Sequence, residues 1–165
     1  MTLSITLIQT DIIWENISDN LNSYQSKINN LKTDVIVLPE MFNTGFTMNS
    51  ENLSEEMGGI TIKWMKDNSK KLDVAICGSL IIKEDGCYYN RFIWVNPDGS
   101  THQYDKKHLF SFAGENENYS SGSSKIVINY KDWKICPLIC YDLRFPVWSK
   151  ISDSRIGFLL SLSSK

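Results

Sequence analysis

The sequence lacks the features that mark export or membrane insertion. Its first ten residues, MTLSITLIQT, contain no basic segment and are followed at once by Asp11, which does not suit a signal peptide. No apolar run approaches the roughly 20 residues that a membrane span needs. The four cysteines show no C-x-x-C spacing, and without an export signal we expect them to stay reduced. These absences predict a cytoplasmic protein.

An excess of positive charge is also missing. The formal net charge is -2, which argues against nucleic acid or an anionic membrane as a partner. One short basic cluster, residues 106–108, is too small to follow a phosphate backbone. The loops G-x-G-x-x-G, G-x-x-x-x-G-K-[ST] and G-x-S-x-G are absent, so dinucleotide, P-loop and serine-hydrolase motifs have no support.

The composition is that of a folded protein. Hydrophobic residues make up 42% and charged residues 22% of the chain, which excludes a disordered polymer. A length of 165 residues suits one compact domain with its own core. We therefore expect residues 1–165 to form a single domain.

Apolar strands alternate with amphipathic helices in the first half of the chain. Apolar residues recur every three or four positions from Ile17 to Leu31, which predicts a helix. A second helix is expected over Thr61–Leu72. Continuous apolar runs are typical of strands covered on both faces, and they predict strands at Thr2–Gln9, Asp34–Leu38 and Asp73–Ile82.

The second half predicts hairpins. Cys87–Val95 follows the preceding strand after a tight turn and ends at the turn of residues 96–99. Residues 105–124 lack periodicity and predict a long loop of the kind that often carries function. A second hairpin is expected from Lys125–Tyr130 and Trp133–Cys140. A short helix should begin at Pro146, and a last strand is expected over Ile156–Leu162. Together these elements predict a mixed α/β fold.

Three of these elements end at residues whose side chains can take part in a reaction. Glu40 follows a buried strand, Lys106 begins the long loop, and Cys140 lies at a strand-to-helix turn. The amide N–H groups at the start of a helix point toward a cysteine at this position and favour its thiolate form.

Taken alone, each residue also has an ordinary structural explanation. Cys140 then is a buried core thiol, Glu40 a solvated loop carboxylate and Lys106 a surface lysine. A metal site is a further alternative, with ligands from Cys136, Cys140, His102 and His108.

The three segments together resemble the signature blocks of the nitrilase superfamily of carbon–nitrogen hydrolases. They are residues 38–40 (LPE), 104–110 (YDKKHLF) and 140–148 (CYDLRFPVW). Their order and their spacing, 66 residues from Glu40 to Lys106 and 34 more to Cys140, suit that family. The sequences of the last two blocks are most similar to those of the omega-amidase branch. Enzymes of this branch deaminate 2-oxoglutaramate and related ω-amides of 2-oxo acids.

The resemblance implies an α-β-β-α sandwich, but it extends only to about Lys150. Family domains are longer, so we expect this fold to be incomplete at its C-terminus. Two hypotheses follow: an amide hydrolase in truncated form, or a non-catalytic remnant. Another activity of the superfamily, on a carbamoyl or nitrile substrate, is a third alternative. The expected partner is a small-molecule amide. Whether two copies of the chain form a homodimer is left open.

Residue roles follow from the same resemblance. Glu40 becomes the general base, Lys106 the cationic stabiliser and Cys140 the nucleophile of a thioester mechanism that needs no metal or cofactor. Glu115 falls where the family often carries a second glutamate, although an exposed loop position is equally compatible. The backbone N–H of Tyr141 is expected to bind the oxyanion. Arg144 either binds a substrate carboxylate or forms a salt bridge, with Asp142 or another acid.

Overall fold

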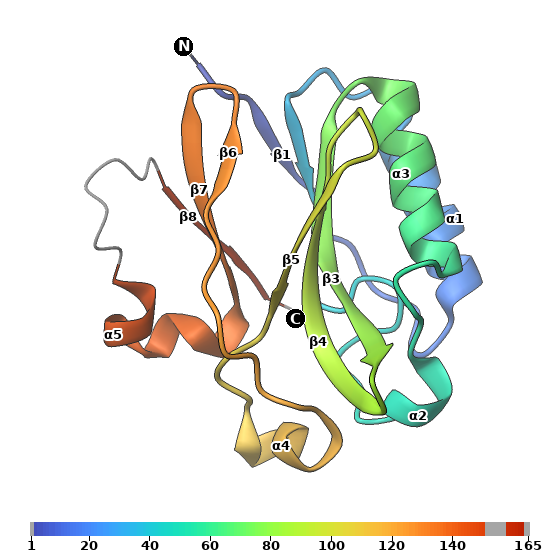
Figure 1. Cartoon of the computed structure of the whole chain (residues 1–165). Helices are drawn as coiled ribbons and strands as arrows, with labels where there is room; N and C mark the ends of the chain where they lie inside the picture. Colours follow the sequence, from blue (N-terminus) through green and yellow to red (C-terminus); the bar gives the residue numbers. More distant parts are fainter. Residues whose placement is uncertain (1, 151–157, 164–165) are drawn as a thin grey trace.

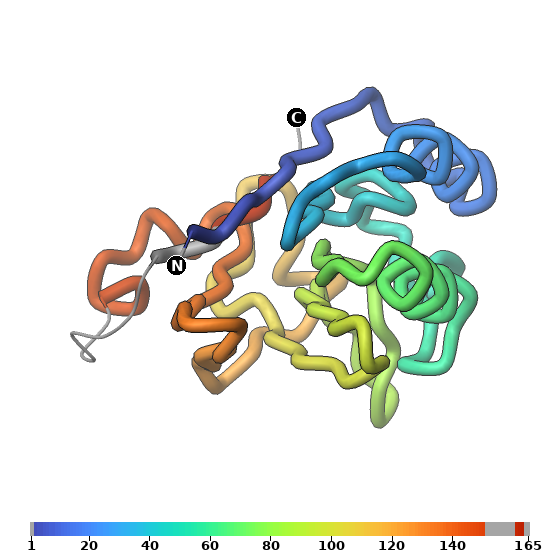
Figure 2. The backbone as a smooth tube through the Cα atoms, turned by 90° about the horizontal axis from the view of Figure 1, so that it is seen from above, coloured from blue at the N-terminus to red at the C-terminus, as the bar shows by residue number. Residues whose placement is uncertain are grey.

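Two β-sheets lie face to face, and two helices cover the outer face of the larger sheet (Figure 1). The structure, a computed structural model, describes residues 2–150 and 158–163. Seen from above, the coils of α1 and α3 lie on the side of the first sheet that faces away from the second sheet (Figure 2). The described residues thus build the helix–sheet–sheet part of the predicted α-β-β-α order.

The larger sheet combines parallel and antiparallel pairing. Its order is β1 (Ile5–Leu7), β2 (Val35–Val37), β3 (Ala75–Glu84), β4 (Cys87–Val95) and β5 (Thr101–Asp105). The pairs β1–β2 and β2–β3 are parallel, and the pairs β3–β4 and β4–β5 are antiparallel. Parallel neighbours need a crossover, which α1 (Ile17–Ile28) and α3 (Ile60–Leu72) supply.

Side-chain alternation along these strands creates two apolar layers. Successive residues of a strand point to opposite faces, so an apolar run covers both. The residues Ile36, Ile76, Leu80, Ile82, Ile93 and Val95 pack with the helices. The residues Val35, Val37, Ala75, Cys77, Phe92 and Trp94 pack with the second sheet. The continuous apolar runs of the sequence are explained by this double burial.

The smaller sheet contains β6 (Ile128–Tyr130), β7 (Trp133–Ile139) and β8 (Phe158–Leu162). The pair β6–β7 is the predicted hairpin, and β8 runs parallel to β7. The Tyr130 ring packs edge-on against Trp94 at 5.2 Å, and its hydroxyl donates to the Asp34 carbonyl at 3.0 Å. These contacts hold the two sheets together.

Short elements complete the described chain. They are α2 (Ser50–Leu53), the 3₁₀ turn η1 (Ser111–Ala113), α4 (Glu115–Asn118), the 3₁₀ turn η2 (Cys140–Arg144) and α5 (Pro146–Ser149). The helix expected from Pro146 is confirmed, and so are the two hairpins. Of the last predicted strand, residues 156–157 lie outside the described residues and the rest is β8.

Two expectations need correction. The strand β5 was not predicted, and the expected loop of residues 105–124 contains η1 and α4.

Among the described helices, none combines the length and apolar character that would let it cross a membrane. The cytoplasmic location stays a prediction.

Candidate active site

Three strands deliver the predicted residues to one region of the fold. Glu40 follows β2, Lys106 follows β5, and Cys140 follows β7. The first two side chains are buried, with relative exposures of 0% and 1%. A solvated loop carboxylate and a surface lysine are therefore wrong descriptions of Glu40 and Lys106.

Glu40 is held by a tight turn against β3. The amide of Met41 donates to Ser79 Oγ at 2.9 Å, and Met41 itself has a φ of 45°. Gly78 allows this close approach, because a Cβ there would lie 2.7 Å from the ring of Phe42. The end of β2 is thus pressed onto its neighbour, which fixes the direction of the Glu40 side chain.

Lys106 lies between two carboxylates. Its Nζ is 2.8 Å from Glu40 Oε1, 3.0 Å from Glu115 Oε1 and 2.9 Å from Glu115 Oε2. Burial alone would lower the pKa of an ammonium group, but the two acidic neighbours outweigh it, so the pKa of Lys106 is raised. Lys106 therefore stays charged, as its predicted role of cationic stabiliser requires.

Glu115 begins α4 and is completely buried. Besides Lys106, it accepts a hydrogen bond from the amide of Phe110 at 2.6 Å. The two possibilities for Glu115 are therefore decided by geometry: it belongs to the cluster and is not an exposed loop residue. The long loop of residues 105–124 folds back onto its own start, since Gly122 donates to the Lys106 carbonyl at 2.9 Å.

Cys140 begins the turn η2 in a left-handed conformation, with a φ of 44°. Such a backbone is uncommon outside glycine and clusters at functional sites. The thiol is half-buried, and the hydroxyl of Ser163 donates to Sγ at 3.7 Å. The nucleophile predicted from the motif thus lies on a turn that departs from ordinary geometry.

The surroundings of Cys140 oppose the thiolate form that the start of a helix favours. Burial, followed by the charge of Glu40, raises the pKa of the Cys140 thiol, and the opposing effects of Ser163 and Lys106 are smaller. The turn after Cys140 is a short 3₁₀ segment. Its few amide groups do not offset an adjacent carboxylate. Glu40 therefore faces a protonated thiol from which it can take a proton.

Asn90 is a member of the cluster that the motifs did not reveal. It is buried in β4, and its Nδ2 donates to Glu40 Oε1 at 2.9 Å and to Glu115 Oε1 at 3.1 Å. A single asparagine inside a strand has no distinctive sequence pattern. Its position beside Lys106, just past the end of β5, is visible only once the hairpin register is known, in which Arg91 lies opposite Asp105.

A cavity of about 520 Å³ opens beside Cys140. Its walls are Phe110, Phe112, Cys140, Tyr141, Leu143, Arg144, Ser161 and Ser163. The side chain of Arg144 is exposed, and Asp142 bonds to other residues, so the alternative of a salt bridge between Arg144 and Asp142 is wrong. The oxyanion role of the Tyr141 amide stays a prediction.

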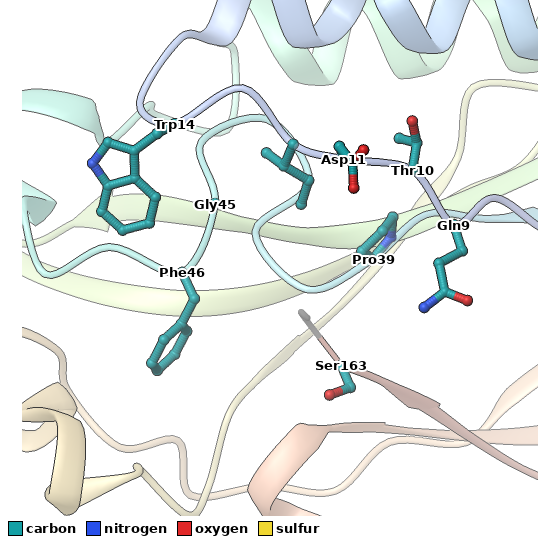
Figure 3. A pocket seen from close by; sticks show the side chains of 9 residues that line it. Gln9, Thr10, Asp11, Trp14, Pro39, Gly45, Phe46 and Ser163 are labelled. Carbon is teal, nitrogen blue, oxygen red and sulfur yellow. The ribbon is translucent and has the colours of Figure 1, made fainter.

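A second cavity, of about 380 Å³, meets the first at Ser163. Figure 3 shows the side chains of Pro39, Phe46 and Ser163 gathered around it. The ring of Phe46 also lies 5.2 Å from Lys106 Nζ. The cluster is therefore flanked by cavities on both sides of the Ser163 segment.

The alternative of a metal site finds no support in the geometry. Over residues 2–150 and 158–163, no three His, Cys, Asp or Glu side chains are arranged to hold a metal ion. Cys136 is buried in the core of the second sheet, and His108 contacts Asp142. The four residues considered from the sequence thus have separate surroundings.

Fold and cluster define an α/β sandwich with a buried Glu–Lys–Glu group beside a cysteine. The sequence profile of the carbon-nitrogen hydrolase family matches residues 4–157. The chain belongs to this family, and the resemblance predicted from the three motifs is confirmed.

Curated relatives share the family and most of this chain. The chain is 42% identical over 151 residues to the omega-amidase YafV of Yersinia enterocolitica. This alignment covers 90% of this chain and 58% of the relative. It is 31% identical over 170 residues to the 2-oxoglutaramate amidase of Bacillus subtilis, covering 100% of this chain and 66% of the relative. The chain thus spans about three-fifths of the length of the first of these relatives.

Solved structures agree with the fold. The XC1258 protein of Xanthomonas campestris, a CN-hydrolase superfamily protein with an arsenic adduct in its active site, superposes with a TM-score of 0.91 at 32% identity. The match covers 98% of this chain and 64% of that chain. The Nit3 protein of Saccharomyces cerevisiae gives a TM-score of 0.85 at 24% identity, over 98% of this chain and 64% of that one. The predicted fold class is confirmed.

Proposed function

We propose that this chain carries the active site of an amide hydrolase in which Cys140 is the nucleophile. The observation that carries the proposal is the position of Lys106 Nζ, within 3.0 Å of both Glu40 and Glu115, together with the electrostatic effect of Glu40 and Lys106 on the Cys140 thiol. A base, a cation and a thiol in contact are the groups that acyl transfer requires. Family membership supports the same chemistry.

In the first half-reaction Glu40 takes the proton of Cys140 as the sulfur attacks the amide carbonyl carbon. The raised pKa of Cys140 requires such a base at neutral pH. The tetrahedral intermediate collapses when the C–N bond breaks. Glu40 returns the proton to the leaving nitrogen, so ammonia departs and a thioester remains on Cys140.

The negative charge on the carbonyl oxygen needs fixed donors. Lys106 stays positively charged between its carboxylates, and the backbone amide of Tyr141 follows the nucleophile directly. One well-placed donor of this kind is worth about 3 kcal/mol of transition-state stabilisation. Glu115 positions Lys106, since both of its carboxylate oxygens lie within 3.0 Å of Nζ.

In the second half-reaction water attacks the thioester. Glu40 removes a proton from this water, the C–S bond breaks, and the sulfur recovers its proton from Glu40. The products are the free acid and the regenerated thiol. Every proton in the cycle passes through Glu40. This carboxylate is buried and is therefore shielded from bulk water.

The proposed substrate is the ω-amide of a small 2-oxo dicarboxylic acid, such as 2-oxoglutaramate. The names of the relatives from Yersinia enterocolitica and Bacillus subtilis support this class. The exposed Arg144 on the cavity wall supplies a guanidinium, whose fork matches a carboxylate in two-point contact. The apolar Phe110 and Leu143 suit the short methylene chain between the two ends.

Ammonia release from 2-oxoglutaramate tests the proposal directly. The wild-type chain is expected to release ammonia, and Cys140→Ala to release none. Cys87→Ala is a matched control, because Cys87 is a partly buried cysteine at the start of β4. Mass spectrometry of the quenched reaction is expected to show an acyl group on the Cys140 peptide.

Two results would contradict the proposal. One is equal ammonia release by Cys140→Ala, and the other is a folded wild-type chain that releases none. A carbamoyl compound and a nitrile, assayed in parallel, decide between the substrate classes of the superfamily.

A further inference from the structure

Asn90 contacts all three charged residues of the cluster. Its Nδ2 donates to Oε1 of Glu40 at 2.9 Å and to Oε1 of Glu115 at 3.1 Å. Its backbone carbonyl accepts the amide of Lys106 at 3.0 Å. A carboxamide carries two N–H donors, so Asn90 can give one to each carboxylate.

The glutamate oxygen that Asn90 contacts is the same one that Lys106 contacts. Nζ of Lys106 lies 2.8 Å from Oε1 of Glu40. Hydrogen bonds to a carboxylate oxygen stabilise its negative charge and make that oxygen a poorer proton acceptor. The two donors on Oε1 therefore fix the Glu40 carboxylate and favour its ionised form.

The orientation of the amide shows what Asn90 is built to do. Its Oδ1 is buried and has no hydrogen-bond partner among the described residues. An unpaired buried carbonyl oxygen destabilises a fold. A turn of the amide by 180° would bring that oxygen against both carboxylates. The donors therefore determine the orientation, and the acceptor is left unsatisfied.

We propose that Asn90 is a positioning residue that holds the Glu40 carboxylate in place and keeps it ionised, so that Glu40 can take the Cys140 proton. In this step the S–H bond breaks and an O–H bond to the Glu40 carboxylate forms. The electron pair left on Sγ attacks the carbonyl carbon. This inference rests on the proposed amide hydrolysis and assigns Asn90 no contact with the reacting atoms.

The groups that face Glu40 determine what a pH profile reports. They are the ammonium of Lys106, the carboxylate of Glu115, the thiol of Cys140 and the phenol of Tyr119, whose pKa is raised by burial and then by the carboxylates. Loss of the Asn90 donors leaves two carboxylates with a single ammonium. Glu40 then binds a proton more readily, which moves the acid limb of kcat/KM to higher pH.

Asn90→Ala and Asn90→Asp test the inference with two readouts. The first is the pH profile of ammonia release, and the second is the pH profile of Cys140 alkylation by iodoacetamide, followed by mass spectrometry. We expect kcat to fall roughly tenfold or more, as for loss of a hydrogen bond to a charged group, with little change in KM. Both midpoints should rise in Asn90→Ala and rise further in the isosteric Asn90→Asp.

Asn20→Ala is the matched control, because Asn20 is a buried asparagine whose amide donates to the carbonyls of Ile13 and Asn43. It should lower the melting temperature without moving either midpoint. Wild-type midpoints in folded Asn90→Ala, or an equal shift in Asn20→Ala, would overturn the inference. If the wild type released no ammonia, the proposed function would fail, and the alkylation profiles would still decide the role of Asn90.

Discussion

Asp142 accepts two hydrogen bonds from His108, one from its backbone amide and one from Nδ1, each at 2.9 Å. The buried carboxylate also accepts from the Tyr104 hydroxyl at 2.7 Å. His108 lies two residues after Lys106, and Asp142 lies two residues after Cys140. One carboxylate therefore ties the lysine segment to the turn of the nucleophile.

Asp142→Asn is expected to loosen this connection. An amide in place of the carboxylate turns an N–H group toward donors on one of its two sides, which leaves them unpaired. The free energy of unfolding should fall by about 1–3 kcal/mol, the usual effect of leaving buried donors unsatisfied. Urea denaturation measures this change. Asp98→Asn is the exposed control, since Asp98 accepts from the amide and hydroxyl of Ser100 in a surface turn and should stay near wild type.

The sequence predicts most of the fold because the buried strands are continuous apolar runs. It misses β5 because this strand lies at the edge of its sheet and is mostly polar: His102 and Gln103 are at least partly exposed, and only Tyr104 is buried. Edge strands depend on the partner strand for their pairing. A single-sequence pattern does not contain that partner.

The candidate site is predictable to the same extent. The resemblance to the family's three signature blocks identifies Glu40, Lys106 and Cys140, and the structure brings the ends of their strands to one place. Asn90 is missed because its role depends on the strand register. The raised pKa of the Cys140 thiol is not predictable from its own segment, because Glu40 comes close to it only in the tertiary fold. Local sequence describes what each residue can do, whereas the charges around it are set by distant segments.

Lys106→Met is expected to leave two buried carboxylates without their cation. Breaking a buried ion pair in this way costs about 3–5 kcal/mol. The pKa of Lys106 is raised above its ordinary value of 10.5, so its stabilising effect is complete below that pH and is lost as the pH rises through the higher folded value. Urea denaturation should therefore show the largest difference from wild type below pH 10.5 and a smaller one above it.

Lys107→Met is the neighbouring control for this experiment. Lys107 is partly exposed, and its Nζ lies 5.8 Å from the ring of Trp148. We expect a change of less than about 1 kcal/mol, as for exposed charges. Equal effects at both positions would contradict the assignment of Lys106 to the buried cluster.

Glu40→Gln is expected to separate the reactivity of the thiol from catalysis. Burial and the charge of Glu40 raise the pKa of Cys140, so removing that charge should lower the pKa and increase the thiolate fraction at a given alkaline pH. Iodoacetamide should then label Cys140 faster, while ammonia release is lost with the base. Cys87 in the same molecules is the internal reference. Slower or unchanged labelling would show that Glu40 does not govern the thiol.

Arg144→Met tests the carboxylate end of the proposed substrate. A charge-assisted contact contributes about 1.5–3 kcal/mol, so KM for 2-oxoglutaramate should rise on the order of 10- to 100-fold while kcat changes little. A neutral aliphatic amide of similar length has no carboxylate to lose, and its kinetics should stay near wild type. Arg144→Lys should lie between the two, because an ammonium keeps the charge without the planar fork. An equal rise in KM for the neutral amide would mean that Arg144 shapes the cavity wall and does not recognise the charge.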